Sequence, residues 1–390
     1  MMNQIEVSAP GRLSLFGEHT VKYGRNGVIA AIDLRTTLQF EELPCLEGAI
    51  NIDFPQINLS RHVLLETFLN FYNECASNMA HLREKVLQFS NDTQYNTPVE
   101  NTILQIFYYL LVYIICKTKL EIKPFAILIS TRLVTNQQEF FCPISYTVCL
   151  AACLLQWSHM QKNNDTSPAA FQINLYAERC LRDISSEFDA TAASVCTYGT
   201  IMKFNQIRKE IEQLFPPFEL TRIKILVVDL KKTQDLEGHA HQLAQLIKCS
   251  PEKTNVLFDK INDVTNSAFD AFQRLSDIHN DEKLVLDTRI KDVLIQHEKI
   301  MDYISQHNLL FEKLVLTLRI NNYFDEVCAV AKKFGCYGKY TNVDNGTYAY
   351  ILCPNASNTQ ISILSNILRS YGYNIKETNL ARSGVNIQVI

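Results

Sequence analysis

The chain has 390 residues, which is enough for one large domain or two of medium size. Hydrophobic residues make up 47% and charged residues 20% of it, as in an ordinary folded protein, and a net charge of -4 argues against nucleic acid as a partner. The first residues show no charged start followed by an apolar core, so we expect no secretory signal, a cytosolic location and reduced cysteines. The 12 cysteines are irregularly spaced without a C-x-x-C pair, so no zinc site is predicted.

Two apolar strands joined by a polar bend are predicted near the N-terminus. The first begins at Ile5, a sharp corner is expected at Ala9–Gly11, and the second strand is expected at Val28–Leu34. Between them, Glu18 and His19 place an acid beside an imidazole. A solvated loop pair is the alternative interpretation, but the position between apolar strands favours a binding role for both residues.

The most apolar run of the chain extends from Ile103 to Cys116. A membrane-spanning helix needs roughly 20 apolar residues, and this run is shorter. We therefore expect a buried core helix and no membrane partner.

A strand, a polar loop and a buried helix are predicted around residues 127–155. Ile127–Ile129 reads as the strand, and the apolar helix begins at Pro143, where the missing N–H of proline is tolerated. A loop that leads into a helix N-terminus can bind phosphate, but it needs glycines for close backbone approach. This loop instead has Gln137, Glu139 and Phe141, and the charge of Glu139 would repel phosphate.

Two acids stand out after this helix. Glu178 lies on a predicted helix at Asn174–Asp183, and Asp189 precedes a run of small residues at Ala190–Ser194. Mg²⁺ prefers one or two carboxylates together with phosphate oxygens, so the pair can serve phosphoryl transfer. The alternative is an exposed helix acid and an N-cap aspartate.

A domain boundary is predicted at Pro216 and Pro217, because a clean strand follows at Ile223–Leu230 and long amphipathic helices come after it. The expected domains are residues 1–215 and 222–390.

The predicted N-terminal strands and the polar bend between them resemble a known protein family. Residues 9–19 read A-P-G-R-L-S-L-F-G-E-H, and Y-G at 23–24 and A-A-I-D-L-R-T at 30–36 follow in order. This series resembles the N-terminal motif of the GHMP small-molecule kinases and, among them, the mevalonate kinase family. Later segments resemble the family too, so the similarity extends from Ile5 to Val385. It implies an α+β fold of two domains: a ribosomal-S5-like N-terminal domain and a ferredoxin-like C-terminal domain with helices on one face of its sheet.

The resemblance also implies roles at the reacting centre. Asp189 would receive or orient the substrate hydroxyl, and Glu178 would help hold Mg²⁺. Arg12 stands where the family usually has a lysine that supports the aspartate and the transferring phosphate, and arginine gives up a proton far less readily than lysine. Glu18 and His19 would lie on the substrate side.

For the nucleotide, Lys231 is the one match to the family's loop after the Ile223–Leu230 strand. Ser145 offers a candidate hydroxyl for the phosphates, but the favoured interpretation is an ordinary first-turn helix residue. The family's phosphate-binding glycines fall on Gln137, Glu139 and Phe141, and Pro143 replaces a serine. The third glycine motif, at residues 341–348, keeps only one glycine.

The resemblance therefore implies an ATP- and Mg²⁺-dependent kinase that phosphorylates the hydroxyl of mevalonate or a similar small alcohol, in isoprenoid and sterol precursor synthesis. The replaced loops favour an alternative, a pseudokinase of this family that has lost nucleotide binding and has a binding or scaffolding role. The sequence leaves the oligomeric state open, a homodimer included.

Overall fold

The computed structural model describes most of the chain in two compact units. The described ranges are 3–18, 20–91, 97–133, 143–163, 166–184, 191–215, 223–233, 236–281, 283–318, 325–343 and 346–390. Unit 1 comprises Met1–Arg12, Leu34–Gly199 and Ser383–Ile390, and unit 2 comprises Leu13–Asp33 and Thr200–Arg382.

The two units are interleaved along the sequence. Strands β1 (Gln4–Phe16) and β2 (Asn26–Glu42) each contribute one part to unit 1 and the other part to unit 2. The predicted domains, 1–215 and 222–390, are continuous, and the boundary between them lies outside the described residues. That division stays a prediction.

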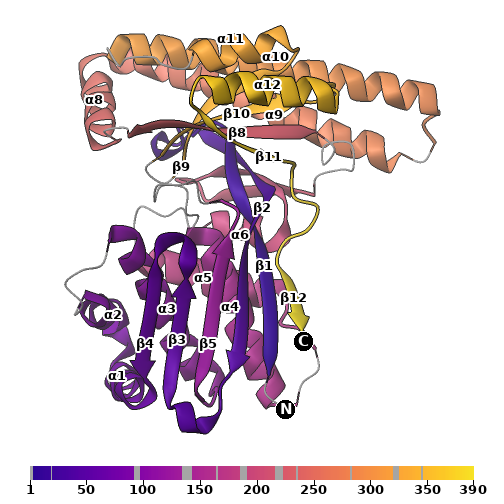
Figure 1. Cartoon of the computed structure of the whole chain (residues 1–390). Helices are drawn as coiled ribbons and strands as arrows, with labels where there is room; N and C mark the ends of the chain where they lie inside the picture. Colours follow the sequence, from indigo (N-terminus) through magenta and orange to yellow (C-terminus); the bar gives the residue numbers. More distant parts are fainter. Residues whose placement is uncertain are drawn as a thin grey trace. The chain divides into compact units, whose positions relative to one another are not determined.

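Unit 1 contains a mixed sheet with the order β12-β1-β2-β5-β3-β4 (Figure 1). Its other strands are β3 (Ala49–Phe54), β4 (Leu59–Leu64), β5 (Phe125–Thr131) and β12 (Asn386–Val389). β3 and β5 run parallel, whereas β12–β1, β2–β5 and β3–β4 are antiparallel. The strand predicted at Ile127–Ile129 is confirmed as the centre of β5.

Six helices accompany this sheet in the described part of unit 1. They are α1 (Leu65–Ser77), α2 (Leu82–Asn91), α3 (Pro98–Thr118), α4 (Pro143–Gln161), α5 (Ala170–Ile184) and α6 (Ala192–Tyr198). Trp157 of α4 packs against Phe40 and Phe125 of the sheet, with ring centroids 4.8 and 5.2 Å apart. Almost every residue of α4 up to Ser158 is buried, as its apolar sequence predicts.

Helix α3 is a core helix. A capping box begins it, in which the Thr97 side chain accepts from the Glu100 backbone and the Glu100 side chain accepts from the Thr97 backbone. Within the described ranges it is the one helix long and apolar enough to cross a membrane, but 61% of its most apolar window is buried within the protein. The sequence prediction of a buried helix here is confirmed.

The corner predicted at Ala9–Gly11 is wrong, because β1 continues through it without a break. Pairing between β1 and β12 ends at Ser8, so the missing N–H of Pro10 interrupts no bond on that side. A β-carbon at Gly11 would lie 2.9 Å from both Leu133 Cδ1 and the Leu34 carbonyl oxygen. This glycine therefore permits close packing within a strand.

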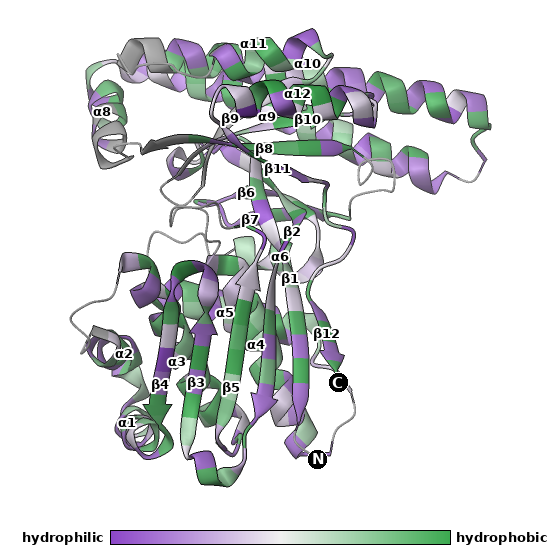
Figure 2. Ribbon diagram, in the orientation of Figure 1, coloured by the Kyte–Doolittle hydropathy of each residue, from purple (hydrophilic) through white to green (hydrophobic). Residues whose placement is uncertain are grey.

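Unit 2 contains an antiparallel sheet with the order β11-β8-β10-β9. The strands are β8 (Lys224–Thr233), β9 (Tyr337–Val343), β10 (Gly346–Cys353) and β11 (Asn374–Thr378). The helices are α8 (Leu236–Cys249), α9 (Pro251–Asn280), α10 (Leu286–Leu318), α11 (Asp325–Lys333) and α12 (Asn358–Ser370). Alternate residues such as Leu226 and Val228 on β8 and Ile351 on β10 form a core with α11 and α12. Figure 2 shows the apolar character of β8 and the alternating hydropathy of the long α9–α10 hairpin.

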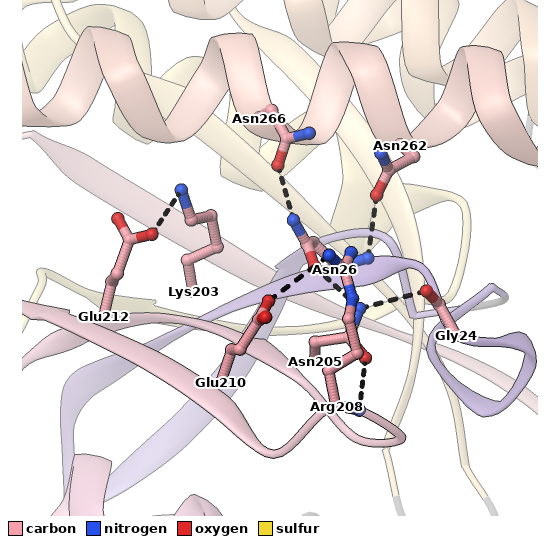
Figure 3. A network of polar contacts seen from close by, with 9 residues as sticks. All are labelled: Gly24, Asn26, Lys203, Asn205, Arg208, Glu210, Glu212, Asn262 and Asn266. Carbon is pink, nitrogen blue, oxygen red and sulfur yellow. Dashed lines mark hydrogen bonds and ion pairs between the residues drawn. The ribbon is translucent and has the colours of Figure 1, made fainter.

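Polar contacts attach the N-terminal strands of unit 2 to α9 (Figure 3). The strand β6 (Ile201–Asn205) pairs with β2, and β7 (Glu210–Leu214) pairs with β6. The Asn26 backbone N–H donates to Asn262 Oδ1 at 2.8 Å, and Asn26 Nδ2 donates to Asn266 Oδ1 at 2.8 Å. Asn205 Nδ2 donates to Asn26 Oδ1 at 2.9 Å, so a chain of amides connects β6, β2 and α9.

Candidate functional site

The predicted site residues belong to both units. Unit 1 holds Arg12, Ser145 and Glu178, and unit 2 holds Glu18. The backbone of Lys231 lies in β8, with its side chain outside the described part, and His19 and Asp189 lie outside the described residues. Arg12 is on β1 and is partly exposed.

Glu178 lies on α5 with a carboxylate that is partly open to solvent. Its side chain is 22% exposed, and Oε1 accepts a hydrogen bond from Asn174 Nδ2 at 3.0 Å. Arg182 Nη2 lies 3.8 Å from Oε2, which is a loose contact. Because one carboxylate with accessible surface is what Mg²⁺ needs beside phosphate oxygens, the geometry of Glu178 fits its predicted role.

No ready-made metal cage accompanies this carboxylate. Among the described residues, no three His, Cys, Asp or Glu side chains converge in a group that could hold a metal ion. A cation at Glu178 would therefore depend on oxygens from a bound phosphate, from water or from residues outside the described ranges.

The helices that flank Asp189 in the sequence pack against each other. α5 ends at Ile184 and α6 begins at Ala192, and the two are in contact. At the end of α6, burial raises the pKa of Tyr198, and the negative charge of Glu178 contributes to the same shift. The electrostatic influence of Glu178 thus reaches α6, the helix that follows Asp189 in the sequence.

A second carboxylate fixes α5 to α3. Tyr109 O–H donates a short hydrogen bond to Asp183 Oδ2, and Arg179 Nε donates to the same oxygen at 2.8 Å. Burial raises the pKa of Tyr109, and the hydrogen bond to Asp183 acts in the same direction. Tyr109 is a core residue, as the sequence predicts, and its bond restrains the helix that carries Glu178.

Ser145 makes its hydrogen bonds inside the core of unit 1. The side chain has no exposed surface, and its Oγ lies 2.8 Å from Thr36 Oγ1. Thr36 Oγ1 is in turn 3.1 Å from Thr131 Oγ1, so the hydroxyls connect α4, β2 and β5. In this arrangement the Ser145 hydroxyl is engaged inside the core, and its role toward a nucleotide stays a prediction.

Glu18 forms a buried ion pair with Lys339 of β9. The side chains of Lys339 and Glu18 are only 1% and 9% exposed, and Lys339 Nζ donates a short hydrogen bond to Glu18 Oε1. Burial lowers the pKa of Lys339, while the charge of Glu18 and this hydrogen bond act against the shift. Lys339 thus largely neutralises the negative charge of Glu18, the residue predicted for the substrate side.

The turn before Glu18 is held by two further elements. Gly17 has a φ of +78°, and its backbone N–H donates to His307 Nε2 of α10 at 3.2 Å. Tyr350 of β10 donates its hydroxyl to the Leu15 carbonyl at 2.6 Å. Sequence reasoning did not identify His307, Lys339 or Tyr350, since nothing in their local patterns marks them as partners of this turn.

Comparison with curated proteins gives similarity to mevalonate kinases over nearly the whole chain, while no family model matches it. The mevalonate kinase of Bos taurus is 23% identical over 402 residues, which cover 98% of this chain and 94% of the relative. That of Dictyostelium discoideum is 22% identical over 420 residues, covering 100% and 97%.

Solved structures share the fold. The mevalonate kinase of Methanococcus jannaschii superposes with a TM-score of 0.66 at 18% identity, covering 96% of this chain and 98% of that one. The mevalonate kinase of L. major, solved in complex with R-mevalonate, gives 0.61 at 14% identity, with 97% and 96% covered. A heptose 1-phosphate kinase gives 0.58 at 13% identity with 99% of both chains covered, so the fold alone does not distinguish the substrate.

The expected α+β fold of two domains is confirmed by these superpositions. The chain thus resembles the GHMP kinase family, and mevalonate kinases within it, both in its fold and along its full sequence, as the N-terminal motif predicts.

Proposed function

We propose that the protein is a cytosolic small-molecule kinase that transfers the terminal phosphoryl group of ATP to the hydroxyl of mevalonate, in isoprenoid and sterol precursor synthesis. The observation that carries the proposal is the similarity to mevalonate kinases, which covers 98% of the chain and is not confined to one motif. Because a related structure holds R-mevalonate, mevalonate is the first alcohol to test.

In this proposal Asp189 orients the substrate hydroxyl and receives its proton. Arg12, which is always charged, stabilises negative charge on the transferring group. Glu178 holds Mg²⁺, which when bound neutralises phosphate charge. The support for Glu178 is its partly exposed carboxylate, which accepts a hydrogen bond from Asn174 and lies 3.8 Å from Arg182.

Glu18 acts indirectly in this scheme. Since its Oε1 is bound to Lys339, the pair fixes the turn that precedes His19 rather than offering a free charge to the substrate. His19 then presents its imidazole to the substrate. The ATP-side contribution proposed for Lys231 is a cation near the phosphates.

A pseudokinase is the second candidate, and one structural observation favours it. Ser145 is bonded to Thr36 in the core, and Pro143, the first residue of α4, has no N–H to donate. Losing a single preorganised donor reduces transition-state stabilisation by about 2.7–4 kcal/mol. A chain that lost several would bind a partner or a small molecule without transferring phosphate.

Titration calorimetry with Mg-ATP, followed by an assay of mevalonate-dependent ADP release, separates the two. For the kinase we expect heat at micromolar to millimolar nucleotide and ADP release that Asp189→Ala abolishes and Glu178→Gln lowers strongly. Glu47→Gln, a change in an exposed turn, is the matched control and should leave both unchanged. No heat at millimolar Mg-ATP would refute the kinase and favour the pseudokinase.

A further inference from the structure

The lining of a groove on unit 1 contains none of the residues used above for catalysis, although its Arg182 lies 3.8 Å from Glu178. It has a volume of about 1120 Å³ and lies between the end of α1, the start of α2, the second half of α3 and α5. Figure 1 shows α1 and α2 at the edge of unit 1 beside β4. The size exceeds that of a single bound ion and suits a small organic molecule.

The rim of the groove is cationic although the whole chain carries a net charge of -4. Its charged lining consists of Arg83, Lys117, Arg179 and Arg182 against Glu84 and Asp183, which leaves a formal charge of +2. These cations come from α2, α3 and α5, so they converge through the fold and not through one basic stretch of sequence.

The cations differ in how far they are already neutralised. Arg179 is paired with Asp183 at 2.8 Å, and Arg182 has only a loose contact at 3.8 Å. Arg83 and Lys117 have no ion-pair partner within the ranges that the structure describes. Two exposed cations on facing helices are therefore available to an anion.

Three tyrosine rings contribute to the lining of the groove. The Tyr109 and Tyr113 rings stack with centroids 5.8 Å apart and an interplanar angle of 25°. Lys117 Nζ lies 5.7 Å from the Tyr113 ring centroid, and Tyr72 adds a third ring to the lining. A flat apolar body can stack on such rings while its charge faces the rim.

We propose that this groove binds a phosphate ester whose organic part is a planar ring. The phosphate lies between Arg83 and Lys117, and the ring rests on Tyr72 and Tyr113. Guanidinium groups match phosphate oxygens through paired N–H donors, and the dianionic charge suits a lining of +2. The inference goes beyond the proposed kinase function, since neither Asp189 nor Glu178 takes part.

Titration of the full-length protein with phenyl phosphate tests the proposal. Inorganic phosphate lacks the ring and benzyl alcohol lacks the charge, so each should bind about tenfold more weakly than phenyl phosphate, or not at all. The double variant Arg83→Gln/Lys117→Gln should weaken phenyl phosphate about tenfold or more, because charge-assisted hydrogen bonds are lost. Tyr113→Leu should reduce the advantage of phenyl phosphate over inorganic phosphate.

The controls locate the site. Arg208→Gln removes an exposed cation from unit 2 and should not change the affinity. Asp189→Ala should abolish kinase activity yet leave this binding intact, which separates the two proposals. Unchanged affinity in a folded double variant, or equal affinity for inorganic phosphate, would overturn the proposal.

Discussion

Lys339 and Glu18 form an ion pair that is almost completely removed from solvent, although 321 residues separate them in the sequence. The pair joins β9 to the turn after β1, and Lys339 Nζ also lies 5.9 Å from the centroid of the Tyr350 ring. Two buried charges of this kind depend on each other, because either one alone would be left without compensation.

Removing one partner should therefore destabilise the protein strongly. We expect Glu18→Gln or Lys339→Met to lower the free energy of unfolding by about 3–5 kcal/mol, measured by chemical denaturation. The double replacement Glu18→Leu/Lys339→Met should lose less than either single variant. Glu210→Gln, which breaks the exposed Arg208–Glu210 pair, should change the stability by less than about 1 kcal/mol. If the double variant lost as much unfolding free energy as the two single variants together, Glu18 and Lys339 would not depend on each other.

Gly17 should tolerate no side chain. Its φ is +78°, and a β-carbon would lie 2.2 Å from the Asn26 carbonyl oxygen, which is backbone and has little freedom to move. Gly17→Ala should lower the thermal midpoint markedly. Gly48→Ala is the matched control, because Gly48 has a φ of +57° with nothing within 4 Å, and only the backbone strain of about 1–2 kcal/mol applies. Equal effects of the two changes would show that the close contact is unimportant.

Ser145 should act on stability and not on nucleotide binding. Ser145→Ala removes the hydrogen bond between Ser145 and Thr36 in the core and should lower the free energy of unfolding by about 1–3 kcal/mol. Thr36→Val, which removes the other side of the same bond, should have an effect of similar size. The Mg-ATP affinity, where measurable, should stay unchanged in Ser145→Ala. A weakened affinity without loss of stability would instead assign the serine to the nucleotide.

Unit 1 should lose stability at high pH through Tyr108. Burial raises the pKa of Tyr108 to about 12 from 10.0, and nearby Arg61 partly opposes the shift. Between these values the unfolded chain gives up its proton first, so the contribution is complete below pH 10 and falls by about 3 kcal/mol toward pH 12. Tyr108→Phe should flatten the decline of unfolding free energy in this window, and Tyr371→Phe, at a side chain 52% exposed, should not.

The sequence predicts the elements with strong apolar patterns and fails where distant partners decide. The buried helix from Pro143 and the strand at Ile127–Ile129 follow from local residues and are confirmed. The corner expected at Ala9–Gly11 is absent, because β1 pairs with β12 only up to Ser8 and therefore accommodates Pro10 without a break. No residue near Pro10 signals where that pairing ends. Lys339 could not be assigned to Glu18, since their meeting depends on the register of β9 and not on any nearby motif.

The pairing of β12 with β1 has a consequence for how the protein is made. Residues 386–389 of β12 pair with residues 5–8 of β1. The long segment of unit 2, Thr200 to Arg382, is synthesised before this closing strand. On the ribosome the edge of β1 stays uncovered until unit 2 has been synthesised. Unit 1 therefore cannot complete its sheet before unit 2 has been synthesised. During that interval the open edge of β1 must be shielded from other nascent chains.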